Sequence, residues 1–173
     1  ETLLAFFEKA HQLKCKVMFN PGAAELAQSK KLIGLLEDVD VLLVNKAEAA
    51  QIVPGTILTE LLSRLANYCK TVLITDGPMG AIATDHKKTY RLGIYEQSPV
   101  CDAIGAGDAF GAGFLAEYAE TKKFKQALQF ASANATMVMQ AYGSQAGIMT
   151  GDEDLHPMPI MEVEDTAEWI KNK

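Results

Sequence analysis

Two short runs of apolar residues constrain the fold of this chain more than any other feature. Residues 41–44 and 72–74 are apolar throughout, polar residues bound each run, and helical patterns lie between them. Runs of this kind are typical of strands that are buried on both faces of a parallel sheet. Residues 81–84 and 88–92 have the pattern of a hairpin at a sheet edge. The order predicts a three-layer α/β/α sandwich with a mostly parallel central sheet and an edge hairpin.

The remaining elements are expected from the spacing of apolar residues. Residues 16–20 predict a first strand, which ends at a Pro-Gly turn. Helices are expected near residues 3–13, 25–37, 46–52, 56–68, 107–120, 124–142 and 165–171.

Composition limits the class of protein. The chain has 173 residues, of which 49% are hydrophobic, so it can bury the core of one domain. A net charge of −6 argues against a nucleic-acid partner that is held by bulk charge, and no apolar run is long enough for a membrane span. The chain opens inside a helical pattern without a signal peptide, which indicates a fragment or a processed chain.

Cysteine usage fits a cytoplasmic location. Cys15, Cys69 and Cys101 are odd in number and lack the spacing of metal ligands, as expected in a reducing compartment. Cys101 is expected to be a buried, inert thiol.

A loop of small residues leads into an aspartate where a helical pattern begins. In Asp-Ala-Ile-Gly-Ala-Gly-Asp, residues 102–108, backbone N–H groups at the helix start can bind an anion. A carboxylate there would repel an anion, unless the anion is a phosphate under attack and Asp108 removes a proton from the attacking hydroxyl. No lysine or arginine lies between Arg91 and Lys122, so backbone N–H groups, the helix terminus and a bound metal would have to hold the anion. Alternatively, Asp108 only stabilises the first helical turn.

Polar residues follow two of the expected strands. Asn45 ends one strand and Glu48 lies three residues later, which suits either a Mg²⁺ site or a capping box. Thr75 ends the next strand, and Gly77 and Gly80 follow it. These glycines would let the backbone approach a nucleotide, although a plain turn uses the same residues.

These segments together resemble a known family. Asn-Lys-Ala-Glu at 45–48, Thr-Asp-Gly-Pro-Met-Gly at 75–80 and the 102–108 loop have the order and spacing found in ribokinase-like (PfkB-type) carbohydrate and nucleoside kinases. The resemblance covers nearly the whole chain and corresponds to the carboxy-terminal half of that family. It departs at Ala103 and Ile104, where the family signature has two threonines. The missing amino-terminal half supplies most sugar contacts and a lid in that family.

The resemblance implies roles for individual residues. Asp108 matches the general base, with an anion hole at Gly105, Ala106 and Gly107. Residues that match nucleotide or phosphate contacts are Asn45, Thr75, Gly77, Gly80 and Asn134. Glu48 matches a residue near the Mg²⁺, and Asp102 matches a ligand of a monovalent cation.

The implied function is ATP-dependent phosphoryl transfer to a hydroxyl of a sugar or related small alcohol. The cofactors are ATP and Mg²⁺, with K⁺ as a further candidate that Ile104 makes less certain. The expected partners are a small sugar or nucleoside and a second copy in a homodimer, with no nucleic acid and no membrane. Residues 1–173 would be the carboxy-terminal nucleotide-binding part of the kinase domain, inactive alone. The alternative is a nucleotide-binding or regulatory module without turnover.

Overall fold

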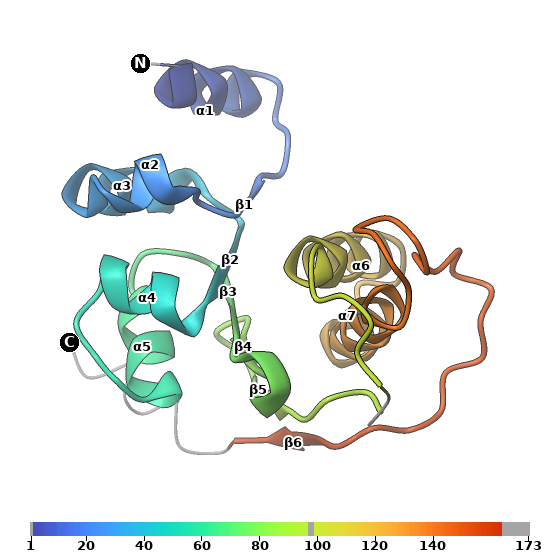
Figure 1. The fold of residues 1–173 in the computed structure, drawn as a ribbon. Coiled ribbons are helices and arrows are strands. Elements are labelled where there is room, and N and C mark those ends of the chain that lie inside the picture. Colours follow the sequence, from blue (N-terminus) through green and yellow to red (C-terminus); the bar gives the residue numbers. More distant parts are fainter. Residues whose placement is uncertain (1, 97–98, 164–173) are drawn as a thin grey trace. The chain divides into compact units, whose positions relative to one another are not determined.

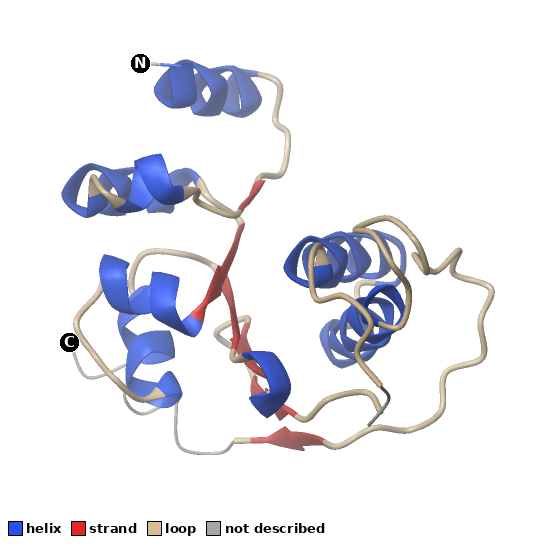
Figure 2. Ribbon diagram, in the orientation of Figure 1, coloured by secondary structure: helices blue, strands red, loops and turns tan. Residues whose placement is uncertain are grey.

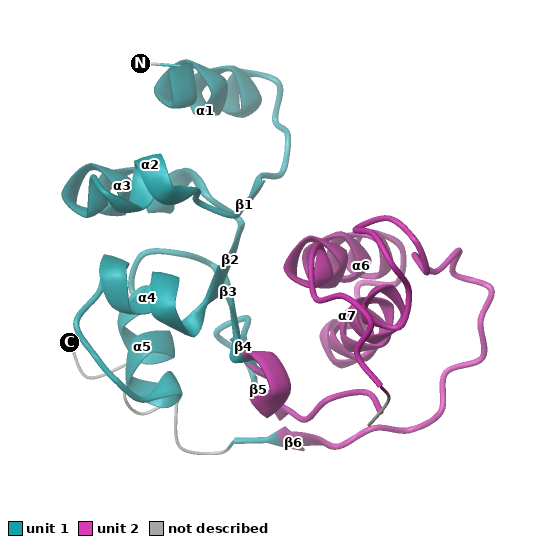
Figure 3. Cartoon of the chain, viewed as in Figure 1, with its two compact units in different colours: residues 1–76, 82–89, 162–173 teal, residues 77–81, 90–161 magenta. Residues whose placement is uncertain are grey.

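The computed structural model describes residues 2–96 and 99–163, and these divide into two compact units (Figure 3). Unit 1 comprises residues 1–76, 82–89 and 162–173, and unit 2 comprises residues 77–81 and 90–161. Each unit is described by itself below. The helix expected near residues 165–171 lies outside the described residues.

Unit 1 alternates helices with strands, as the sequence predicts (Figures 1 and 2). Its elements are α1 (Thr2–Gln12), β1 (Met18–Phe19), α2 (Ala23–Leu26), α3 (Ser29–Leu35), η1 (Leu36–Asp38), β2 (Val41–Asn45), α4 (Lys46–Ile52), α5 (Leu58–Leu65), β3 (Thr71–Thr75) and β4 (Ala81–Thr84). The single helix expected over 25–37 is three short pieces instead. Glu25 bonds back to the Gly22 N–H (3.0 Å) and α2 ends at Leu26, before α3 begins.

The first three strands are parallel neighbours. β1 pairs with β2 from Met18 opposite Val41, and β2 pairs with β3 along its whole length, from Val41 opposite Thr71 to Asn45 opposite Thr75. The four residues of each long strand before its last are buried, which confirms the prediction from the apolar runs. Because β2 and β3 run in the same direction without a slip, their carboxyl ends meet at one place.

Over residues 2–96 and 99–163, the sheet contains six strands in the order β1-β2-β3-β4-β5-β6. β5 (Thr89–Leu92) neighbours β4, and the turn between them is closed by Asp85, whose Oδ1 accepts from the N–H groups of Lys87 (3.0 Å) and Lys88 (2.9 Å). β6 (Ile160–Glu162) lies beside β5 and is the last strand of this order. The sequence instead predicts the hairpin of residues 81–84 and 88–92 at the edge of the sheet. Backbone bonds from Gly93 to Pro159 (3.0 Å) and from Val163 to Thr89 (2.8 Å) hold it there.

The core of unit 1 lies between the helices and the parallel strands. Phe7 of α1 meets Phe19 of β1 edge-to-face at 5.5 Å. One face of α5 is fully buried, at Leu61, Leu62 and Leu65. The spacing of these leucines on successive helical turns explains why this polar segment folds as a helix against the sheet.

Unit 2 is built on two long helices, α6 (Ala106–Thr121) and α7 (Phe124–Met139), which confirm the two helices predicted in this region. Phe114 of α6 meets Phe124 edge-to-face at 5.7 Å. Gly113 allows the helices to approach closely, because a Cβ at this position would lie 3.2 Å from the Cβ of Asn134.

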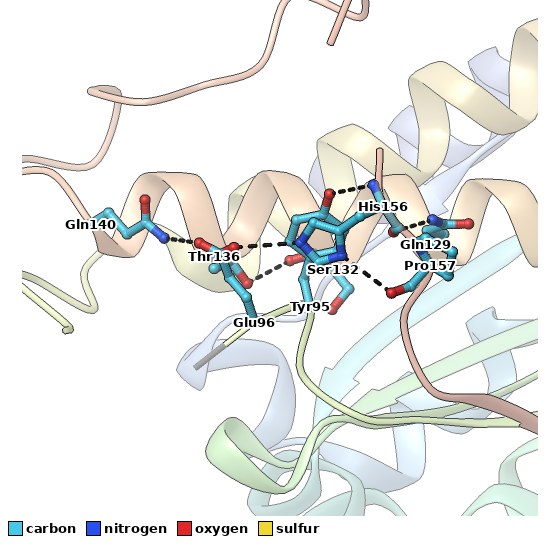
Figure 4. Close-up of polar contacts among 8 residues, drawn as sticks. All are labelled: Tyr95, Glu96, Gln129, Ser132, Thr136, Gln140, His156 and Pro157. Carbon is cyan, nitrogen blue, oxygen red and sulfur yellow. Dashed lines mark hydrogen bonds and ion pairs between the residues drawn. The ribbon is translucent and has the colours of Figure 1, made fainter. Parts of the chain in front are cut away.

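The segment that follows α7 returns along unit 2 and is fastened to α7 through His156 (Figure 4). The His156 ring stacks on Tyr95 at 4.1 Å, and its backbone N–H donates to the Tyr95 hydroxyl (3.0 Å). Gln129 of α7 donates to the His156 carbonyl (2.8 Å).

Among the described residues, no helix is long and apolar enough to cross a membrane.

Candidate functional site

In unit 1, Asn45 and Thr75 lie side by side at the carboxyl ends of β2 and β3. Both side chains are at least partly exposed, unlike the buried residues that precede them in each strand. Lys46 and Asp76, the residues that follow, form an ion pair with Nζ 3.5 Å from Oδ2. This pair was not anticipated from the sequence, because nothing in the spacing of Lys46 and Asp76 indicates that they meet. The carboxyl ends of parallel strands are where α/β proteins bind ligands.

Asn45 and Glu48 form a capping box at the start of α4. The Asn45 Oδ1 accepts from the Glu48 N–H (2.9 Å), and the Glu48 Oε2 accepts from the Asn45 N–H (2.8 Å). The capping box, which the sequence offers as the alternative to a Mg²⁺ site, is therefore present in the structure. It uses one oxygen of the Glu48 carboxylate, and within the described residues Oε1 makes no hydrogen bond. The box and a role near a metal are compatible.

In unit 2, the turn Gly77–Gly80 depends on both of its glycines. Gly77 has φ +53° and Gly80 has φ +81°, and the Gly80 N–H closes the turn on the Gly77 carbonyl (3.0 Å). A Cβ on Gly80 would lie 2.0 Å from the carbonyl oxygen of Leu92 in β5. Gly80 thus has a structural reason to be glycine, and its contact with a nucleotide remains a prediction.

The first turn of α6 begins at a glycine that lies close to Ser144. Gly105, the residue before the helix, has φ +84°, and a Cβ there would lie 2.7 Å from the Cβ of Ser144. The N–H groups of Ala106 and Ala109 are bonded to backbone oxygens, at 3.3 and 2.8 Å. Within residues 2–96 and 99–163, those of Gly107 and Asp108 have no backbone partner, and the Asp108 side chain is exposed. Two free donors and one carboxylate therefore share this turn.

The loop before α6 is tied to the end of α7. The N–H groups of Cys101 and Asp102 both donate to the Met139 carbonyl, at 2.8 and 3.3 Å. The Asp102 Oδ1 accepts from the Ile104 N–H (2.9 Å), which bends the loop. The Cys101 side chain is exposed, so the expectation of a buried thiol was wrong. Free cysteines are usually buried, which was the basis of the expectation, whereas this one lies exposed in the loop before α6.

Asn134 of α7, expected at an adenine pocket, is 3% exposed. Its Nδ2 donates to the Ala109 carbonyl of α6 (2.7 Å), and its Oδ1 accepts from the Met149 N–H (2.9 Å). The side chain thus joins both helices of unit 2 to the segment that follows α7. Its contact with adenine stays a prediction beside this structural role.

No group of three or more His, Cys, Asp or Glu side chains in the described ranges is arranged to hold a metal. Mg²⁺ in a nucleotide site takes one or two carboxylates and completes its shell with waters and phosphates, so it does not need such a group. The Glu48 carboxylate, with one oxygen outside the capping box, suits that role.

The predicted residues thus gather within each unit. Unit 1 holds Asn45, Glu48 and Thr75 at one pair of strand ends. Unit 2 holds the residues of the turn, the loop and the helix start. Sequence reasoning did not assign Ser144 to the neighbourhood of Gly105; a glycine before a helix signals a close neighbour but does not say which one.

Comparison with known proteins gives this geometry a family. Residues 1–150 match the pfkB family of carbohydrate kinases. The chain belongs to that family. The pfkB match confirms the resemblance seen in the 102–108 loop and at the strand ends, and it covers every predicted site residue.

Individual pfkB relatives agree with the family match. Ribokinase of Bacillus subtilis is 28% identical over 153 residues, which are 88% of this chain and 50% of ribokinase. Nucleoside kinase of Methanocaldococcus jannaschii is 26% identical over 138 residues, 79% of this chain and 45% of that enzyme. The chain therefore spans about half the length of these relatives.

Solved structures share the fold. The crystal structure of the M. jannaschii nucleoside kinase matches with a TM-score of 0.67 and 25% identity, over 78% of this chain and 44% of that one. Aminoimidazole riboside kinase from Salmonella enterica, solved with aminoimidazole riboside and an ATP analogue, matches with a TM-score of 0.71 and 20% identity, over 83% of this chain and 52% of that one. The α/β ribokinase-like fold predicted from the sequence is confirmed.

Proposed function

We propose that the complete protein is an ATP-dependent kinase that phosphorylates a hydroxyl of a sugar, nucleoside or related small alcohol. Membership of the pfkB family supports the class of reaction. The observation that carries the proposal is the first turn of α6, where the N–H groups of Gly107 and Asp108 lack backbone partners among the described residues and the Asp108 carboxylate is exposed. Anion donors beside a base are what phosphoryl transfer to an alcohol requires.

In this mechanism Asp108 is the general base. Its carboxylate takes the proton as the O–H bond of the acceptor breaks and the acceptor oxygen forms a bond to the γ-phosphorus. The bond from that phosphorus to the bridging oxygen breaks, and ADP leaves with the electron pair. The N–H groups at the helix start stabilise the negative charge on the phosphoryl oxygens. Gly105 shapes this turn, and Ala106 and Gly107 keep it free of bulky side chains.

The remaining predicted residues would serve the nucleotide and its ions. Glu48 would hold Mg²⁺ through Oε1, and the metal, when bound, supplies positive charge to the phosphates. Asn45, Thr75, Gly77, Gly80 and Asn134 are proposed nucleotide or phosphate contacts. Asp102 is a proposed ligand for K⁺, although its Oδ1 also accepts from Ile104 N–H.

A nucleotide-binding or regulatory module without turnover is the second candidate. This chain spans about half of each relative described above. We propose that residues 1–173 are the carboxy-terminal nucleotide-binding part of a kinase domain and are inactive alone. An acceptor that no pocket holds near Asp108 would react with a very low effective molarity.

Two measurements on the complete protein separate the candidates. Isothermal titration with ATP and Mg²⁺ tests nucleotide binding, and ADP release over a panel of sugars and nucleosides tests turnover. The kinase proposal predicts ADP release that depends on one class of acceptor. Nucleotide binding without turnover on any acceptor would favour the module.

A further inference from the structure

Arg91 makes a contact with the Gly77–Gly80 turn that the proposed function does not yet use. It lies in β5 between Tyr90 and Leu92, which are 6% and 1% exposed, and its own side chain is half-buried. Its Nη2 donates to the carbonyl oxygen of Met79 at 2.7 Å. A hydrogen bond from a charged donor is stronger than one between neutral groups, so this contact fixes the turn well.

β5 holds the turn at two adjacent positions. The Arg91 guanidinium binds the Met79 carbonyl, and the Leu92 carbonyl lies where a Cβ of Gly80 would be. The Met79 side chain, at 64% exposed, leaves the outer surface of the turn open. β5 therefore holds the turn in the conformation that would let a nucleotide approach its backbone.

The Arg91 guanidinium has N–H donors that the turn does not use. Arg91 Nη1 is buried and has no hydrogen-bond partner within the part of the chain that the structure describes. No carboxylate in that part forms an ion pair with Arg91. The acid nearest to the turn in sequence, Asp76, pairs with Lys46 instead. A buried N–H donor without a hydrogen-bond partner is costly and calls for an explanation.

We propose that Arg91 is a positioning residue for nucleotide binding: it holds the Gly77–Gly80 turn through the Met79 carbonyl, and its uncompensated charge favours a nucleoside triphosphate at that turn. This inference rests on the proposed function and extends it. A polyphosphate would supply negative charge beside Arg91, with which no carboxylate among the described residues forms an ion pair. Arginine suits the task better than lysine, because its planar fork can hold one acceptor while other N–H groups stay available.

Three variants of the complete protein separate the contributions of Arg91. Arg91→Met removes both donor and charge, Arg91→Gln retains a neutral N–H donor, and Arg91→Lys retains the charge without the fork. The control is Arg64→Met on α5, which loses an arginine whose Nη2 pairs with Glu60 at 2.8 Å. Isothermal titration with ATP and Mg²⁺ at low and high salt gives Kd, and steady-state rates give KM for ATP and for the acceptor. Thermal melting reports the stability of each variant.

Arg91→Met is expected to raise Kd for ATP about tenfold, the effect of losing one charge-assisted hydrogen bond, and to weaken its salt dependence. KM for the acceptor should stay unchanged, Arg91→Gln and Arg91→Lys should be intermediate, and Arg64→Met should bind ATP as the wild type does. If Arg91→Met does not fold, Arg91→Gln and Arg91→Lys are each compared with the wild type. A raised Kd for ATP in both supports the proposal, and an unchanged Kd in both overturns it. A lowered melting temperature with unchanged Kd for ATP would overturn the inference alone. No ATP binding by the wild type would overturn the proposed function as well.

Discussion

Ser144 packs directly against Gly105, so that a Cβ on Gly105 would lie 2.7 Å from the Ser144 Cβ and 2.8 Å from its carbonyl oxygen. The segment that follows α7 thereby supports the loop from which α6 begins. Gly105 also has φ +84°, a conformation that L-residues with side chains rarely adopt. The helix start at which we propose the anion hole therefore follows a loop that Ser144 supports.

Gly105→Ala and Gly107→Ala form a matched pair on this turn. Alanine at 105 meets both the Ser144 contact and the positive φ, so we expect it to destabilise the protein by about 1–3 kcal/mol and to weaken ATP binding. A Cβ at Gly107 meets no atom within 4 Å, so alanine there should leave stability unchanged or raise it by roughly 0.5–1 kcal/mol. Chemical denaturation of both variants measures the difference. Equal stability of the two would contradict the role assigned to Ser144.

Glu48 can be tested for a metal role apart from its capping role. Glutamine at position 48 keeps an oxygen that can accept from the Asn45 N–H, so Glu48→Gln should preserve the capping box and the melting temperature. The loss of charge should raise the Mg²⁺ concentration that gives half-maximal rate. Glu48→Ala should change both quantities, with a loss of about 1 kcal/mol in stability. A Glu48→Gln variant with wild-type Mg²⁺ dependence would leave Glu48 with capping alone.

Asp40 is expected to make stability depend on pH. Partial burial raises the pKa of its carboxyl group, but the N–H of Val17 (3.0 Å) and the ammonium groups of Lys16 (3.0 Å) and Lys70 (3.1 Å) together outweigh burial, so the pKa lies below the ordinary value of 3.8. Because the folded pKa is the lower one, the stabilisation is complete above the unfolded pKa and is lost as pH falls through the folded pKa.

Asp40→Asn should therefore lower stability by about 1 kcal/mol near neutral pH, and the difference from the wild type should shrink as the pH falls below the ordinary pKa of 3.8. Thermal melts at several pH values measure it. The control is Asp38→Asn, which replaces a nearby exposed carboxylate. Its melting temperature should stay close to that of the wild type throughout this pH series. A penalty for Asp40→Asn that does not change with pH would contradict this assignment.

The parts of the fold that could be predicted are those set by local pattern. β2 and β3 follow from apolar runs because every residue that faces either side of a parallel sheet is buried there. β6 was missed, since Ile160–Glu162 follows two prolines and is a strand only because backbone groups of distant residues pair with this segment. In the candidate site, too, local pattern can be predicted and distant contacts cannot. The sequence offers two reasons for Gly80, a nucleotide contact or a plain turn, but the Leu92 carbonyl that leaves no room for a Cβ there is visible only in the structure.

Asn45 and Glu48 illustrate a different limit. The same two residue types at the same spacing serve a capping box and a metal site, so no pattern can distinguish the two roles. Asn134 shows a third limit, because its partners Ala109 and Met149 belong to other segments of unit 2. Long-range hydrogen bonds of this kind leave no periodic signal in the sequence.

The most direct test of the central claim is acceptor-dependent ADP release by the complete protein and its Asp108→Asn variant. If Asp108 is the general base, Asp108→Asn should lower kcat by roughly 10²–10⁴-fold on the best acceptor of a sugar and nucleoside panel. Its Kd for ATP, measured by titration, should stay near the wild-type value, because the lost carboxylate serves the acceptor hydroxyl. Acceptor-dependent ADP release that persists near the wild-type rate in Asp108→Asn would contradict the account.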